Sequence, residues 1–229
     1  MAYPWTRTPP QVICFDMDGT LLNSGVFGVR AITRAFESLM ATGRLPGLKA
    51  PPPPELIKAQ IGKPPSVFYR DLLPPALQER SHELHEQTTR NELASLADGS
   101  GGLFKGTPDV LDKLKQAGLK LMLVSNCSQA YLDGVVNTFH LMRWLDYSQC
   151  VGDHPPQDRT KTNLVRAGLI ELAVSQGAMV GDRIHDGEAA QANGLWFIGC
   201  TYGYGKREEF AEAAALITDI RELPALLGF

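Results

Sequence analysis

Polar side chains end three apolar runs of this sequence, and their types could do chemistry together. Six residues form these groups: Asp16, Asp18, Ser125, Asn126, Asp182 and Asp186. Carboxylates can act as nucleophiles, transfer protons and bind hard cations. A turn could explain an Asp or Asn at the end of any single run. Three such groups, with Lys161 between the second and the third, favour one shared ligand site instead.

The elements that must position these residues alternate along the chain. Short apolar runs predict strands at residues 11–15, 119–124, 150–151, 178–180 and 196–198. Amphipathic spacing predicts helices at 29–40, 55–60, 67–73, 75–97, 129–139, 162–172, 187–193 and 210–215. We also expect a helix that begins with Thr107 as its N-cap and Pro108 as its first residue. Each polar group therefore follows a predicted strand, where open α/β sheets bind their ligands.

The pattern between residues 103 and 220 differs from the stretch before it. Alternating strands and helices there predict a parallel sheet with helices on both faces. Residues 23–100 read as all-helical, apart from a loop that contains the proline run 51–54. We therefore expect an α/β, Rossmann-like core of residues 1–22 and 101–229, with a small all-helical domain of residues 23–100 inserted after its first strand.

Composition excludes several classes of protein. The net charge of −3 and the lack of a basic block argue against a nucleic-acid polymer as partner. The four cysteines are widely spaced without a Cys-x-x-Cys pair, which argues against a zinc site or a disulfide framework and for a reducing, cytoplasmic location. No signal peptide or apolar run of about 18 residues is evident, so we expect no membrane span.

Four segments, in order, resemble the signatures of the haloacid dehalogenase superfamily. They are Asp16-Met17-Asp18-Gly19-Thr20-Leu21, Ser125 after its strand, Lys161, and Gly181-Asp182-Arg183-Ile184-His185-Asp186. An Asp-x-Asp alone is a weak signal, whereas the ordered set covers the whole core. The helical insert corresponds to the cap domain in one branch of this superfamily.

The resemblance implies a role for each residue. Asp16 would attack a phosphate ester and form an aspartyl-phosphate, while Asp18 would protonate the leaving oxygen and then activate water. Mg²⁺ would be held by Asp16, the backbone carbonyl of Asp18 and Asp182, with Asp186 binding through water or directly. The expected phosphate-binding residues are Gly19, Thr20, Ser125, Asn126 and Lys161, and Lys63 of the cap loop is the expected specificity residue.

The segment 181–205 further resembles the phosphoglycolate phosphatase branch, especially Thr201-Tyr202-Gly203-Tyr204-Gly205. We therefore expect a small phosphorylated metabolite as substrate and a monomer or homodimer in solution. The alternatives are a phosphosugar mutase, a nucleotidase or a pyrophosphatase, and a non-catalytic binding protein. A dehalogenase is disfavoured, because such enzymes lack the aspartate found here at position 18.

Overall fold

The computed structural model describes residues 9–153 and 156–229, and it has a six-stranded parallel sheet at its centre. The strands are β1 (Val12–Phe15), β2 (Lys120–Ser125), β3 (Tyr147–Cys150), β4 (Gly177–Gly181), β5 (Trp196–Cys200) and β6 (Ala215–Ile217). Their order is β3-β2-β1-β4-β5-β6, and every pairing is parallel. The expected α/β, Rossmann-like fold is confirmed. The N-terminal residues 1–8 of the predicted core lie outside the described residues.

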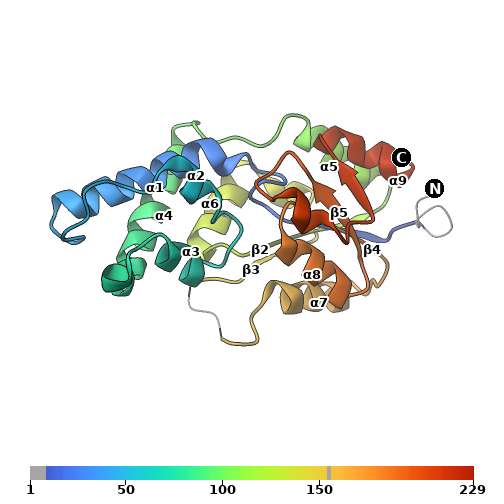
Figure 1. Cartoon of the computed structure of the whole chain (residues 1–229). Helices are drawn as coiled ribbons and strands as arrows, with labels where there is room; N and C mark the ends of the chain where they lie inside the picture. Colours follow the sequence, from blue (N-terminus) through green and yellow to red (C-terminus); the bar gives the residue numbers. More distant parts are fainter. Residues whose placement is uncertain (1–8, 154–155) are drawn as a thin grey trace.

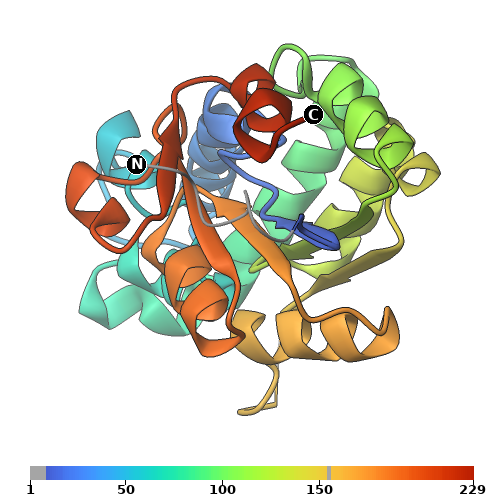
Figure 2. The same cartoon turned by 90° about the vertical axis from the view of Figure 1, so that its right-hand side faces the viewer.

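Helices cover both faces of the sheet (Figures 1 and 2). They do so because successive strand residues point to opposite faces and those on both faces are apolar. Ile13 and Phe15 of β1 pack with α5 (Thr107–Gln116), α6 (Gln129–Thr138) and α9 (Leu223–Leu227). Val12 and Cys14 point to the other face and pack with α7 (Lys161–Glu171) and α8 (Ile184–Ala192). This burial fixes the register of β1 and hence the position of the polar loop that follows it.

Between β1 and β2 the chain is helical. It forms α1 (Ser24–Ala41), α2 (Pro54–Lys58), α3 (Pro65–Asp71), a 3₁₀ turn η2 (Pro75–Arg80) and α4 (Ser81–Ala97). These helices gather on one side of the sheet in Figure 1 and enclose an apolar cluster that includes Phe36, Ile57 and Leu84. That residues 23–100 form a separate domain stays a prediction.

Two expectations about local structure are wrong. Gly106, with φ of 88°, is the N-cap of α5, so Thr107 is its first residue and Pro108 its second. The predicted helix 210–215 is absent: the chain makes a 3₁₀ turn η4 (Arg207–Phe210) and then strand β6. Pairing of 215–217 with β5 overrides the helix propensity of the alanine-rich segment.

Other boundaries shift by a few residues. Strand β3 begins three residues before the expected Cys150, at Tyr147. The expected helix 75–97 divides into η2 and α4, and short 3₁₀ turns η3 (Leu141–Arg143) and η5 (Ile220–Glu222) precede β3 and α9. No helix among the described residues is long and apolar enough to cross a membrane.

Replacing Leu111 by alanine should destabilise the core. Leu111 is fully buried between α5 and the sheet. We expect the free energy of unfolding to fall by about 2–5 kcal/mol, because the substitution removes apolar contacts and leaves a cavity. Denaturant unfolding measures this change. Lys113→Ala, at an exposed position of the same helix, should alter it by no more than about 0.5 kcal/mol, and an equally small effect of Leu111→Ala would contradict the packing described here.

Candidate active site

Three buried carboxylates converge at the carboxyl end of the sheet. Asp16 follows β1, Asp182 follows β4, and Asp186 lies in the first turn of α8. One oxygen of each lies within 4.8 Å of the other two. Strands β1 and β4 are paired neighbours in the sheet, which brings Asp16 and Asp182 together although they are far apart in the sequence.

Lys161, the first residue of α7, supplies positive charge to this group. Its Nζ donates hydrogen bonds to Asp16 Oδ1 at 2.5 Å and to Asp186 Oδ1 at 2.7 Å. Burial alone would lower the pKa of Lys161, but the two carboxylates raise it above its usual value. The lysine therefore stays charged.

The carboxylates remain short of positive charge. Burial raises the pKa of Asp16 to about 7, although Lys161 opposes the rise. Burial also raises the pKa of Asp182 well above its usual range, and the charges of Asp16 and Asp186 raise it further. One lysine therefore does not balance three buried acids.

Two of the carboxylate oxygens are suited to a cation. Asp16 Oδ2 and Asp182 Oδ1 are buried and have no hydrogen-bond partner. Such oxygens are costly to bury unless something binds them. An all-oxygen donor set with excess negative charge fits Mg²⁺, which prefers carboxylates and retains water ligands. Asp16 and Asp182 could therefore hold the ion, with Asp186 beside them.

The loop after β5 fixes the position of Asp182. The backbone N–H of Tyr204 donates to Asp182 Oδ2 at 2.6 Å. A Cβ on Gly203 would lie 2.4 Å from the Asp182 side chain, and one on Gly205 would lie 1.8 Å from its carbonyl oxygen. The two glycines thus let the backbone approach Asp182 closely, which accounts physically for the Gly-x-Gly in the segment 201–205.

Asp18 lies beside Asp16 and is held by different contacts. Burial raises its pKa, while hydrogen bonds from Ser24 and Tyr131 lower it. The Tyr131 hydroxyl donates to Asp18 Oδ1 at 3.1 Å. A carboxyl group with a raised pKa can carry and release a proton near neutral pH.

The remaining expected phosphate-binding residues lie in two places. Ser125 ends β2 and lines a pocket together with Asp16 and Asp18. Asn126 lines the same pocket, but its Nδ2 donates to the Gly62 carbonyl at 2.8 Å. Gly19 and Thr20 lie in the loop after β1 and are absent from the pocket wall. Gly19 has φ of 87° and packs directly on Asp182.

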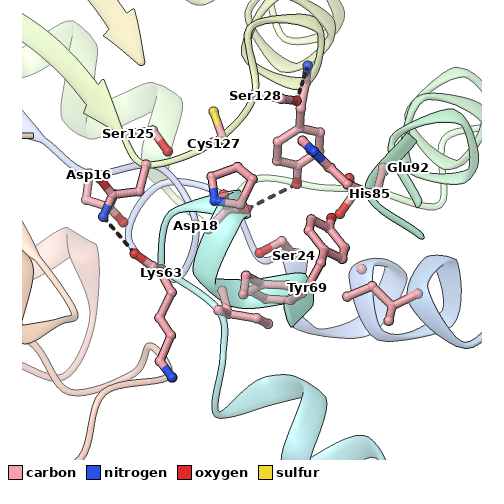
Figure 3. Close-up of a pocket in the computed structure, with 18 residues that line it drawn as sticks. Asp16, Asp18, Ser24, Lys63, Tyr69, His85, Glu92, Ser125, Cys127 and Ser128 are labelled. Atoms are coloured by element: carbon pink, nitrogen blue, oxygen red, sulfur yellow. Dashed lines mark hydrogen bonds between the residues drawn. The ribbon is translucent and has the colours of Figure 1, made fainter. Parts of the chain in front are cut away.

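The pocket separates these residues from the helices between β1 and β2, and its volume is about 70 Å³. In Figure 3, Asp16, Asp18 and Ser125 lie on one side, while Tyr69, His85 and Glu92 lie on the other. Lys63 also lines it, but its side chain extends away from Asp16 and Asp18. The Lys63 Nζ donates to Asp71 at 2.9 Å and to Gln60 at 2.6 Å.

Several residues near the site escaped the sequence analysis. Tyr131 and Glu92 approach it through tertiary packing, and no local pattern identifies them. Arg183 lies within the quoted segment 181–186, a signal that could have identified it. Its Nε donates to Glu209 Oε2 at 3.0 Å, and it packs against Gly62.

The chain is similar to known proteins over most of its length. The model of the family described as haloacid dehalogenase-like hydrolase matches residues 13–200. A relative from Pseudomonas aeruginosa, phosphoglycolate phosphatase 1, is 26% identical over 93% of this chain and 78% of its own length. Protein CbbY from Cereibacter sphaeroides is 25% identical over 95% and 96% of the two chains.

Solved structures share the fold. A haloacid dehalogenase-like family hydrolase from Streptococcus pneumoniae superposes with a TM-score of 0.78 at 18% identity, covering 94% of this chain and 97% of its own. CbbY from Rhodobacter sphaeroides in complex with phosphate gives 0.75 at 23% identity, with 96% and 100% covered.

Stabilisation by Mg²⁺ should depend on pH. Folding raises the pKa of Asp16 to about 7. Ionisation of Asp16 therefore destabilises the metal-free fold as the pH rises from the pKa of this group in the unfolded chain toward 7. A bound cation would offset the cost of the ionised, buried carboxylate. Below about pH 7 it would first have to displace the proton on Asp16. We expect Mg²⁺ to raise the melting temperature more at about pH 8 than at about pH 5.5. Thermal unfolding with and without Mg²⁺ measures this, and an increase independent of pH would contradict it.

Replacing Gly203 by alanine should weaken Mg²⁺ binding. The added Cβ would collide with Asp182 and displace a carboxylate that could hold the ion. We expect the dissociation constant for Mg²⁺, measured by calorimetry, to rise about ten- to hundredfold. Gly102→Ala is the control, since nothing lies within 4 Å of the added Cβ there. Equal affinities in both variants would show that the Gly203 contact does not position Asp182.

Proposed function

The chain belongs to the haloacid dehalogenase-like hydrolase family, and on this basis we propose that it is a magnesium-dependent phosphatase of small phosphate monoesters. The observation that carries the proposal is the partnerless Asp16 Oδ2 in a buried group of three carboxylates. Lys161 bonds to the other oxygen of Asp16 and so places a positive charge beside the carboxylate proposed as nucleophile. Asp18, two residues on, supplies a proton donor.

The reaction has two steps. Asp16 attacks phosphorus, the ester bond breaks, and Asp18 gives its proton to the leaving oxygen. Asp18 then accepts a proton from water, which attacks the aspartyl-phosphate and releases phosphate and Asp16. Lys161 offsets the charge of nucleophile and phosphoryl group, and Ser125 donates to a phosphoryl oxygen. Bound Mg²⁺ would neutralise the repulsion between the carboxylates and the phosphate.

We further propose that residues 23–100 act as a cap over this site. Their separate apolar cluster supports an independent folding unit. The Asn126 hydrogen bond to Gly62 and the packing of Gly62 on Arg183 support docking of the loop 61–64 on the core. Such a cap excludes water while the phosphoryl group is transferred.

The names of the relatives make 2-phosphoglycolate the reference substrate. The alternatives are a phosphosugar mutase, which must keep the phosphoryl group from water, and a nucleotidase or pyrophosphatase. The cavity of about 70 Å³ in this conformation makes a small ester the first substrate to test. Four free cysteines support a cytoplasmic location. For the assembly in solution we propose a monomer or a homodimer.

Replacing Asp16 by asparagine should abolish turnover. The neutral amide is a poor nucleophile and a weaker metal ligand, so we expect phosphate release to fall by roughly three orders of magnitude or more. The assay follows free phosphate from 2-phosphoglycolate, sugar phosphates, nucleotides and pyrophosphate, with Mg²⁺ and with chelator. Turnover near that of the unmodified protein would contradict Asp16 as nucleophile.

The same panel separates the alternatives. Metal-dependent phosphate release supports a phosphatase, and release confined to one ester identifies its preferred substrate. Isomerised sugar phosphate without free phosphate would indicate a mutase. No reaction of any ester in the presence of Mg²⁺ would contradict an enzymatic role on phosphate monoesters.

A further inference from the structure

Helix α4 directs polar side chains into the helical layer that faces the site. His85, Thr88 and Glu92 are spaced by three and four residues, so they share one face of the helix. His85 and Glu92 line the pocket, and the fully buried Thr88 lies beside the side chain of Tyr69, which lines it as well. Burying polar groups on a helix is unfavourable unless they bind something. His85 stacks on Tyr69, so Glu92 is the residue of this face that is best suited to a ligand.

Glu92 is the most unusual residue on this face. Among the described residues it makes no hydrogen bond or ion pair, although its carboxyl group lines the pocket opposite Gly28. Burial raises its pKa well above the usual value, and the charge of Asp18 raises it further. In Figure 3, Glu92 lies with Tyr69 and His85 across the pocket from Asp16.

The pocket offers little positive charge to a second anionic group. Lys63 is the one Lys or Arg among its lining residues, in the part of the chain that the structure describes. Its Nζ is paired with Asp71, and the His85 ring lies 3.4 Å from a carboxylate oxygen of Asp153. A substrate carboxylate placed here would instead face Glu92 and Asp18.

The lining does offer partners for hydroxyl groups. Glu92 can accept hydrogen bonds, and the hydroxyls of Ser24 and Tyr69 can donate or accept them. The small cavity of about 70 Å³ limits the leaving group to a few heavy atoms in this conformation.

From this lining we infer that the substrate's leaving group is a short, neutral chain that carries a hydroxyl group, and that Glu92 selects it against a carboxylate. The inference rests on the proposed function and specifies its substrate class. It differs from what the names of the relatives suggest, because 2-phosphoglycolate carries a carboxylate at this position. Glu92 acts on binding and need not take part in the transfer of the phosphoryl group.

Two esters that differ in one group test this directly. 2-Hydroxyethyl phosphate carries a CH₂OH group where 2-phosphoglycolate carries a carboxylate. We expect kcat/KM for the hydroxyl ester to exceed that for the carboxylate ester by about tenfold or more. At alkaline pH, where Glu92 is ionised despite its raised pKa, this ratio should fall by about tenfold in Glu92→Gln, mainly through KM, because the amide lacks the charge that repels the carboxylate. A ratio of two substrates on one preparation does not depend on the fraction of folded enzyme.

Glu86→Gln is the matched control, since Glu86 is an exposed glutamate of the same helix, and its ratio should match that of the unmodified protein. p-Nitrophenyl phosphate reports on catalysis without a polar group on the leaving chain. Suppose that the protein hydrolyses p-nitrophenyl phosphate. A preference for 2-phosphoglycolate, no reaction of either alkyl ester, or an unchanged ratio in Glu92→Gln would then each overturn this inference but not the proposed function. No release from any of the three esters would overturn the proposed function as well.

Discussion

The accumulation of negative charge at one end of the sheet is the constraint on which the rest of the structure depends. Asp16, Asp182 and Asp186 are buried within a few ångströms of one another, and Lys161 alone contacts two of them. Folding such a group is unfavourable because burial disfavours each ionised carboxylate. The apolar core on both faces of the sheet therefore has to fix the strands firmly enough to hold these acids together.

This constraint explains features outside the carboxylates themselves. The Tyr204 N–H and the glycines around it restrict Asp182 to one orientation, which leaves its Oδ1 without a partner. Asp16 is restricted in the same way by Lys161 and likewise retains one partnerless oxygen. The hydrogen bonds thus satisfy one side of each carboxylate and leave the other available. A cation that binds both partnerless oxygens would offset the repulsion and link stability to activity.

The sequence predicted the strands of the core well because they depend on local signals. An apolar run that ends at Asp16 or Asp182 indicates both a strand and the candidate site residue that follows it. Residues 210–215 were misassigned because pairing with β5 is not visible in local propensity. Tyr131 and Glu92 could not be found for the same reason, since their contacts with the site form between distant segments. Lys63 lies beside the pocket, but its partner Asp71 determines where its charge lies, and local sequence does not reveal that partner.

The central claim, covalent transfer of the phosphoryl group to Asp16, can be tested by trapping the intermediate. Asp18→Asn should slow the attack of water, and an aryl phosphate needs little protonation of its leaving group. Protein mixed with this ester and Mg²⁺, then quenched in acid, can be digested and analysed by mass spectrometry. The account predicts that the peptide containing Asp16 gains the mass of one phosphoryl group. Consumption of the ester with a phosphoryl group on another residue, or on none, would contradict it.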